Sequence, residues 1–424
     1  MYKTGRFLLI CLLALMSTVI SAQKNVYSPF ARYGIGIIGQ EGTFRTRAMG
    51  GISSGIRNSL TLNFPTPASY SSIDTASFIF DFGLDYTGNM LKNADLTYYS
   101  QDLTFSHLIM GFPVIKGLGV VVGIIPYSNG AYNIADETDA GSVAGDILES
   151  HKGYGGYHKA LLGAGYSPIQ HVSAGVNMFF VFGEENRIND FTFISDENYF
   201  NTRKHGSIAM NGIGYEVSLQ LMAPLPANWH INAGLTYTPG FNLKTTTEEF
   251  IFRYSSVQTS ALAFDTLYQD TGSITSRLPR TIRAGLSVGQ NDKFTAGADI
   301  VYTKWTEASL PGTYGIYRDA LAFHAGAEYI PDLYSNYGFF NRVEYRIGCR
   351  YGESYTLFDG DVVNEYGITF GAGLPLRRSR SRISVYFDLS NRGNLDDNLF
   401  RETKLSIGAS LNLFDYWFLK AKYE

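Results

Sequence analysis

The feature that most constrains this chain is an alternation of apolar and polar residues that recurs from about residue 76 to the C-terminal end. In the first such segment Phe78, Phe80 and Phe82 share one face of an extended chain, and Asp81 and Asp85 share the other. A period of two residues indicates β-strands with one apolar and one polar face. The pattern repeats in residues 171–182, 212–221, 229–237 and 404–413. We count about 14 such segments, which is within the range of bacterial single-chain barrels.

The composition of the polar face separates a membrane barrel from a secreted β-sandwich or propeller. A sandwich also alternates, but its polar face points to solvent and is loaded with Lys, Glu and Thr. Here the polar positions are mostly Gly with a few charges, in a chain that contains 45 Gly. Glycine suits a crowded, concave lumen, and a wholly apolar opposite face suits lipid. The sequence therefore predicts an all-β fold, a transmembrane antiparallel β-barrel of about 14 strands.

Hydropathy and aromatic content agree with this fold. After the N-terminal leader, no apolar run approaches the ~20 residues that a membrane helix needs. The chain nevertheless contains 30 Tyr and 29 Phe. Aromatic residues near strand ends are expected to form girdles at the membrane interfaces, although they are also good strand formers in general. The girdle candidates are Tyr86, Tyr166, Trp229, Tyr237, Tyr302 and Trp417.

Residues 1–22 have the organisation of a secretion signal. Lys3 and Arg6 precede an apolar run from Phe7 to Val19, and Ala22 is a small residue at the expected cleavage site. Cleavage there would leave Cys349 as the sole cysteine, so no disulfide within the chain is expected. The formal net charge of −4 gives no indication of a nucleic-acid partner.

Loop lengths favour an outer-membrane arrangement. Gln290–Asp292 reads as a tight turn, whereas Asn133–Gly153, Glu184–His205 and Thr245–Thr271 read as long polar loops on the outward side. Short turns on one side and long loops on the other are typical of outer-membrane barrels. The expected location is therefore the outer membrane of a Gram-negative cell, with lipid around the wall.

Between the leader and the strands lies a lead-in and candidate plug, residues 23–75. Its central stretch, Arg45–Ser71, is rich in Gly, Ser and Asn and follows neither a strand nor a helix period. A polar lumen must be filled, so we expect this stretch to lie inside a barrel made by residues 76–424. The plug candidates are Arg47, Met49, Asn63, Phe64, Pro65 and Pro67.

Charged residues on the lumenal parity predict a network inside the barrel. A hairpin that turns at Asn291 would place Arg283 opposite Asp299, so we expect a cross-strand ion pair. We also expect Asn63, Arg57 and Arg47 to find hydrogen bonds on the faces of Arg283/Asp299 and residues 342–350. Mixed signs without a ring of one sign favour a structural role over a solute track. The network candidates are Asp81, Asp85, Glu216, Arg283, Asp299, Glu328, Arg342, Glu344, Arg346, Arg350 and Asp388.

No catalytic constellation emerges from the sequence. The pairs His171/Ser173 and His205/Ser207 share strand faces, but the first lies on the lumenal parity and the second lacks an acidic orienting partner. The seven His include no HExxH motif and no Cys/His cluster. Gly34–Gly39 formally matches a dinucleotide fingerprint without the strand and helix that such a site needs. We therefore expect no enzyme activity, cofactor or metal.

Several short motifs resemble the FadL/TodX family of outer-membrane transporters for hydrophobic compounds, in the variant common in Bacteroidetes. Arg47–Gly51 followed by Asn63–Ser69 is similar to the N-terminal plug of that family, although Phe64-Pro65-Thr66 is inserted into its Asn-Pro-Ala element. The resemblance implies a 14-stranded barrel, a plug in the lumen, and passive uptake of long-chain fatty acids or similar molecules. The other similar motifs are Leu278–Arg280, Asp299–Trp305, Gly326–Tyr329, Arg346–Tyr351 and Trp417–Tyr423.

Two functions from different classes remain open on the sequence. The first is passive transport of a hydrophobic small-molecule ligand through a plugged barrel. The alternative is a non-transporting accessory or scaffold barrel in a Bacteroidetes outer-membrane secretion or barrel-assembly complex, with other outer-membrane proteins as partners. A continuous apolar path into the lumen would favour transport, and a wall of paired charges would favour the scaffold.

Overall fold

The computed structural model of the chain describes residues 27–416, except for 94–95, 140–145, 194–199, 255–262, 312–316, 337, 359, 378 and 396–399. The signal sequence, Trp417 and the motif Trp417–Tyr423 lie outside the described residues. None of the helices in the described part of the chain is long and apolar enough to cross a membrane.

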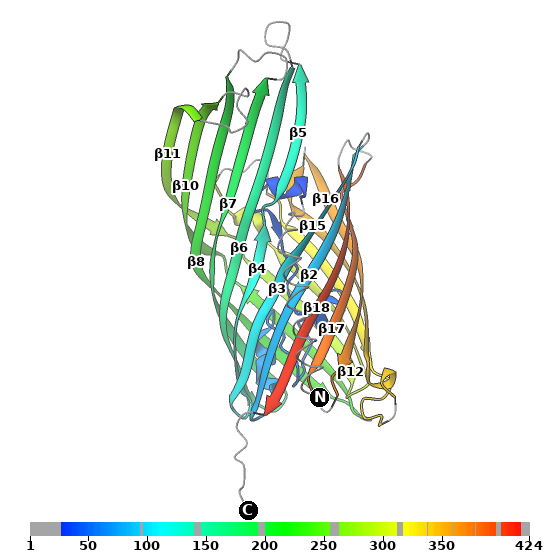
Figure 1. Cartoon of the computed structure of the whole chain (residues 1–424). Coiled ribbons are helices and arrows are strands. Elements are labelled where there is room, and N and C mark those ends of the chain that lie inside the picture. The colour runs from blue at the N-terminus through cyan, green and yellow to red at the C-terminus, as the bar shows by residue number, and fades with distance from the viewer. Residues whose placement is uncertain are drawn as a thin grey trace, which may run out of the picture.

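The fold is a closed antiparallel β-barrel of 14 strands, as the alternation predicts (Figure 1). The last strand pairs with the first, from Arg401↔Lys92 to Tyr416↔Ser77, and this pairing closes the ring. In order around the wall the strands are β2 (Ser77–Lys92), β3 (Thr97–Ile115), β4 (Leu118–Asn129), β6 (Asp146–Ile169), β7 (Val172–Phe193), β8 (Asn201–Pro224), β9 (Trp229–Thr238), β12 (Thr281–Gln290), β13 (Phe294–Thr303), β14 (Ala320–Tyr329), β15 (Glu344–Phe358), β16 (Asp361–Pro375), β17 (Arg382–Arg392) and β18 (Arg401–Tyr416).

Burial along the wall follows the alternation. On β8, Ile213 and Leu219 are exposed on the outside, whereas Ser218 and Gln220 are buried toward the lumen. An exposed apolar exterior around a polar interior is the reverse of a water-soluble protein, and lipid satisfies it. The short turns, such as residues 116–117 and 291–293, gather at one end of the barrel, which we call the short-turn end.

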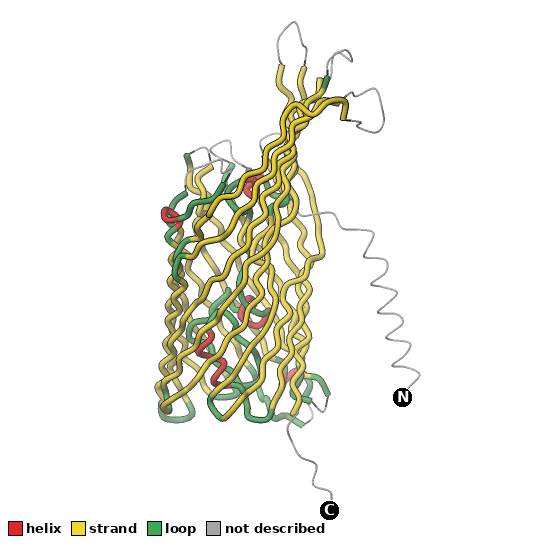
Figure 2. The backbone as a smooth tube through the Cα atoms, turned by 90° about the vertical axis from the view of Figure 1, so that its left-hand side faces the viewer, coloured by secondary structure: helices red, strands yellow, loops and turns green. Residues whose placement is uncertain are grey.

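At the other end one side of the wall continues far beyond the rest (Figure 2). This projection consists of β5 (Tyr132–Asp139), the outer halves of β6, β7 and β8, then β10 (Phe241–Tyr254) and β11 (Ala263–Leu278), paired in that order. We call it the fin. The prediction of long loops at Asn133–Gly153, Glu184–His205 and Thr245–Thr271 is therefore wrong for most of each range. Both faces of the fin meet water, so the strands carry polar residues on both sides and lack the alternation that marks the wall.

The wall has a seam between β3 and β4. These strands pair from Ile115↔Leu118 to Leu108↔Ile124, and beyond that point Thr97–His107 of β3 pair only with β2 among the described residues. The free edge of β4 is taken instead by β1 (Ile37–Ile38), which pairs with Ser128 and Asn129. The seam opens in the half of the wall nearer the fin.

The N-terminal segment from Ser28 to Ile73, which we call the lumenal segment, runs through the interior of the barrel (blue in Figure 1). Besides β1 it contains only short elements, because its Gly, Ser and Pro residues break both periods. Most of its residues are buried against inward-facing wall side chains. The elements are η2 (Pro29–Arg32), α2 (Phe44–Arg47) and η3 (Pro67–Ser72); two further 3-10 turns, η4 (Trp305–Glu307) and η5 (Phe340–Arg342), lie in wall connections.

Candidate functional site in the barrel lumen

The first contact of the lumenal segment with the wall is a buried charge network around Glu328. Both Arg45 and Arg346 donate to the Glu328 carboxylate, at 2.6 Å from Arg45 Nη2 to Oε1 and 2.7 Å from Arg346 Nε to Oε2. Arg346 also pairs with Glu344, whose other oxygen accepts from Arg382 Nε at 2.7 Å. A carboxylate shared by two guanidinium groups on different elements fixes both, because removing it would leave two buried cations.

The second contact lies across the barrel at Asp85 on β2. Arg47 donates from Nη2 to Asp85 Oδ2 at 2.7 Å and from Nη1 to the Ser106 hydroxyl at 3.0 Å. Its guanidinium carbon lies 5.1 Å from the ring centre of Phe44 and 4.8 Å from that of Tyr386. Charge, hydrogen bonds and ring contacts together hold α2 against β2, β3 and β17.

The third contact involves Asp299 and Arg283, but not as the predicted pair. The hairpin register places Asp299 opposite Gly285 and Arg283 opposite Val301, because the turn takes residues 291–293 and shifts the pairing by two. Asp299 accepts instead from the backbone and hydroxyl groups of Ser53 and Ser54, with Ser53 N to Oδ2 at 2.7 Å.

Arg283 pairs with Glu41 of the lumenal segment, at 2.8 Å from Nη2 to Oε2. Lys159 on β6 pairs with the other oxygen of Glu41 at 2.9 Å. Burial acts to raise the pKa of Glu41, but the charges of Lys159 and Arg283 outweigh it and hold the pKa well below its ordinary value. Glu41 therefore joins two wall strands that are not neighbours.

The expected partners of Asn63, Arg57 and Arg47 are also wrong. The Asn63 amide donates to the carbonyl oxygens of Ser53 and Ile56, within the lumenal segment. Arg57 donates to hydroxyl and carbonyl oxygens, including Ser173 Oγ at 2.8 Å, and has no carboxylate partner among the described residues. Burial without a counter-charge lowers its pKa to about 10.

The remaining plug candidates pack against the wall. Phe64 lies in the largest buried apolar cluster, and its carbonyl accepts from the Asn177 amide at 2.9 Å. The Pro65 carbonyl faces the Thr236 hydroxyl at 3.5 Å. Wall glycines allow this approach: a Cβ at Gly175 would collide with the Pro67 backbone, and one at Gly348 with the backbone of Met49 and its successor. Glycine on the polar face is thus a packing requirement of the segment.

Most of the other network candidates contact side chains of the wall, and Arg342 lies apart from them. Asp81 accepts from His107 Nε2 at 3.1 Å, and Arg350 pairs with Asp388 and Glu365. Glu216 accepts from the Asn177 amide at 2.6 Å. Arg342 lies in η5 ahead of the strand, so it does not share the buried face of Glu344, Arg346 and Arg350.

Sequence reasoning missed three charged residues that hold this arrangement: Arg45, Glu41 and Lys159. Arg45 and Glu41 lie in an aperiodic stretch where no pattern assigns a direction to a side chain. Lys159 lies in the stretch of β6 that was not assigned to a strand, although its inward parity with Leu161 and Gly163 was available. Arg392 pairs with Glu365 and Glu402, so it belongs to the same network of lumenal charges.

A cavity of about 1150 Å³ lies beside the lumenal segment. Its lining includes the paired groups Glu41/Lys159, Arg47/Asp85 and Arg350/Glu365. It reaches the seam, where Leu103 and Phe105 of β3 face Pro126 and Tyr127 of β4. No cluster of His, Cys, Asp and Glu suited to a metal ion occurs in the described part of the chain. Apolar side chains also line the cavity away from the seam, among them Phe179, Phe182 and Trp305, so charged and apolar groups share its surface.

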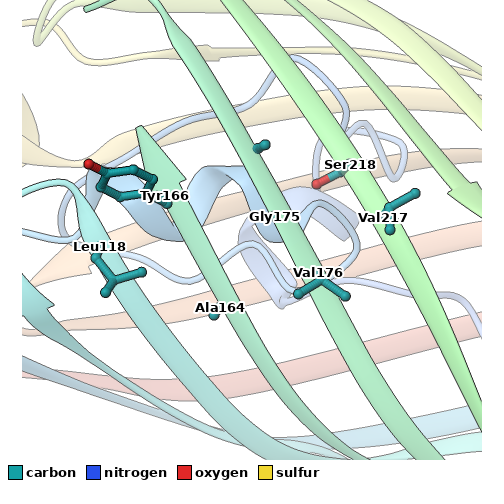
Figure 3. Close-up of a pocket in the computed structure, with 8 residues that line it drawn as sticks. Leu118, Ala164, Tyr166, Gly175, Val176, Val217 and Ser218 are labelled. Carbon is teal, nitrogen blue, oxygen red and sulfur yellow. The ribbon is translucent and has the colours of Figure 1, made fainter. Parts of the chain in front are cut away.

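A second hollow, of about 410 Å³, lies in the wall of β4, β6, β7 and β8, with η3 behind it (Figure 3). Its lining is apolar or small, including Leu118, Val176 and Val217. Tyr166 borders it at the short-turn end, in the position expected for an interfacial girdle. Tyr166 and Ser218 supply the hydroxyl groups of this lining, which is otherwise apolar or glycine and contains no charged group.

Several solved structures share this fold. The Pseudomonas putida toluene transporter TodX matches with a TM-score of 0.61 and 16% identity, over 90% of this chain and 100% of that one. The CymD monoaromatic hydrocarbon channel matches with a TM-score of 0.59 and 13% identity, over 91% and 99%. A Pseudomonas aeruginosa FadL homologue matches with a TM-score of 0.56 and 12% identity, over 87% and 98%. At these identities the similarity establishes the outer-membrane FadL-type barrel fold.

Comparison by sequence gives a more specific result. No curated protein sequence matches the chain. The sequence profile of one family, BamG, matches residues 1–424, the whole length of the chain. The chain therefore belongs to the BamG family.

Proposed function

We propose that this protein is a non-transporting barrel of the outer membrane, closed by its N-terminal plug, that serves as an accessory or scaffold subunit of a larger assembly such as a secretion or barrel-assembly complex. The observation that carries the proposal is the way in which the wall holds the lumenal segment, which is the proposed plug. Glu328 on β14 and Asp85 on β2 bind Arg45 and Arg47 of α2, and Asp299 on β13 binds the backbone at Ser53. Opening the lumen would break these three buried contacts together.

The lining of the cavity supports the same reading. Sites for hydrophobic ligands are predominantly apolar with a few polar groups. The charged groups that line this cavity beside its apolar side chains include carboxylates and cations that already pair with one another, such as Glu41 with Lys159 and Arg283. An apolar solute would gain little there, since it would replace water around charged groups without pairing with them.

Purification from native outer membranes in a mild detergent tests this proposal. We expect the full-length chain, tagged at an outward connection, to be recovered with at least one other protein in fixed stoichiometry. A matched preparation of a FadL-type transporter from the same cells controls for trapping in detergent. Recovery of the chain as a monodisperse species without a partner, across several detergents, would overturn the scaffold proposal.

A second candidate is passive transport of a hydrophobic small molecule, for example a long-chain fatty acid. The seam favours it, because the cavity is lined there by Leu103 and Phe105 of β3 and Pro126 of β4, beyond the point where the two strands stop pairing. The related barrels TodX and CymD are described as a toluene transporter and a hydrocarbon channel. On this candidate, deletion lowers uptake of a labelled fatty acid or arene and the intact gene restores it. Unchanged uptake on deletion rules this candidate out.

A further inference from the structure

Among the described residues, the outer edge of β11 is a long strand edge that no other strand covers. On one side, β11 pairs with β10 through consecutive partners from Tyr268↔Ile251 to Leu278↔Phe241. On the other side, the described residues supply one isolated bridge, Arg277↔Ser309 at the base. Above that bridge β11 forms the rim of the fin (Figure 1), and among the described residues its backbone groups on that side have no strand partner.

The opposite rim of the fin shows what a protected edge looks like. There β5 spans only Tyr132–Asp139 and places Asp136 and Glu137 at its exposed part. Short length, charges, prolines and bulges are the usual ways in which proteins keep sheet edges from pairing with other chains. From Tyr268 to Ser276, β11 has a regular register, no proline, no lysine, and one charge, Asp270. Tyr268 and Ile274 of this stretch are exposed.

We propose that the edge of β11 from Tyr268 to Ser276 is a docking edge, to which a partner protein adds an extended strand at the cell surface. The proposal deepens the scaffold function and rests on it. Added strands bind through main-chain hydrogen bonds, and side chains at alternate positions give specificity. The edge therefore specifies a partner segment in an extended conformation, free of proline where its amides pair.

The charge of the edge identifies the chemistry of that partner. Asp270 lies opposite Glu249 on β10, and Glu249 is already paired with Lys204 at 2.8 Å. Asp270 itself has no cationic partner among the described residues, and only the Tyr268 hydroxyl interacts with it. A basic side chain on the incoming strand would complete it, next to an apolar residue beside Ile274. A second copy of the stretch from Tyr268 to Ser276 has no Lys or Arg to offer Asp270, so the occupant is a different chain with Lys or Arg in its strand.

Site-specific photocrosslinking in native outer membranes tests the docking edge. A benzoylphenylalanine at Tyr268 is expected to give one discrete adduct with a partner, and the crosslinked peptide should contain Lys or Arg within an extended segment. The same probe at Asn133, exposed on the rim at β5, is the matched control and should give none. Asp270→Lys should lower the adduct yield by about tenfold, because attraction becomes repulsion. Replacing the matching basic residue of the partner by Asp should restore it.

The outcomes separate this proposal from the one it rests on. An adduct of twice the mass of this chain, or one mapped to an acidic segment, overturns the docking edge. Absence of an adduct at Tyr268 while a partner still co-purifies also overturns it and leaves the scaffold function intact. Absence of both overturns the scaffold function. Heat-modifiable electrophoretic migration of each variant, unchanged from the parent, shows that a lost adduct does not reflect misfolding.

Discussion

The wall and the fin share three strands but differ in which side chains those strands carry on each face. Strands β6, β7 and β8 pass without interruption from one to the other. In the wall, β8 has apolar residues outside and polar residues inside; in the fin the same strand carries Lys204 and Ser207 where both faces meet water. Backbone pairing is common to both regions. The surroundings, lipid on one side or water on both, decide which side chains are compatible.

Ion pairs differ between the two regions in the same way. Glu328 is buried between Arg45 and Arg346, whereas Glu249 on the fin pairs with Lys204 at the surface. A buried carboxylate with two cationic partners cannot be removed without leaving uncompensated charge. A surface pair is screened by water, so its loss has little effect.

The largest effect that would sharpen this comparison is expected for Glu328→Ala. Loss of the shared carboxylate should destabilise the folded barrel by about 3–5 kcal/mol, because Arg45 stays buried without its carboxylate partner and Arg346 keeps only Glu344. Glu249→Ala is the matched control and should change stability by no more than about 1 kcal/mol. Denaturant titration in detergent or lipid, followed by heat-modifiable migration, measures both. Equal effects would mean that the lumenal network is as well solvated as the fin.

A second test introduces an arginine at either of two positions on the same face of β8, one in the wall and one in the fin. Leu219→Arg should cost about 2–4 kcal/mol near the membrane midplane, since lipid cannot solvate the guanidinium. Ser207→Arg, on the same face in the fin, should stay within about 0.5 kcal/mol. Folding into lipid vesicles followed by denaturant titration gives both values. A comparable cost at the two positions would mean that the fin also lies in the membrane.

The smallest effect concerns the pH dependence of the Glu41 bridge. Because the pKa of Glu41 is lowered in the folded protein, its stabilisation is fully present above the ordinary value of 4.5 and is lost as the pH falls toward the folded pKa. Protection of the lumenal segment against proteolysis should thus be constant between pH 8 and pH 5 and decline below that range. Glu41→Gln should lower protection already at pH 7 and flatten the acid decline. A wild-type decline centred near pH 6 would contradict this assignment.

Sequence reasoning was correct where a strand has lipid on one side and the lumen on the other. The barrel, its strand number and its inward faces followed from the alternation, since lipid and lumen impose opposite demands on successive residues. The alternation also placed Asp81, Asp85, Glu328 and Arg346 on inward faces. It could not find the cross-strand neighbour of Arg283, because moving the centre of the turn by one residue shifts every cross-strand partner by two and leaves no hydropathy signal.

The fin escaped prediction for the complementary reason. A strand with water on both sides has no preferred face, so Thr245–Thr271 reads as a loop although β10 and β11 pair regularly there. Aromatic and β-branched residues such as Phe250, Ile251 and Phe252 were an available signal of strand propensity. Propensity alone, without alternation, is too weak to decide between a strand and a loop.

The sequence by itself thus determined that this chain forms a 14-stranded barrel with an apolar exterior and a glycine-rich interior, because local periodicity encodes which side of each strand meets lipid. Only the tertiary structure decided what occupies that interior and by which contacts. Arg45 with Glu328 and Glu41 with Arg283 join residues more than 240 positions apart, and no local pattern encodes such pairs. Tertiary structure also extended one side of the wall into the fin and left the edge of β11 above Arg277 without a strand partner among the described residues.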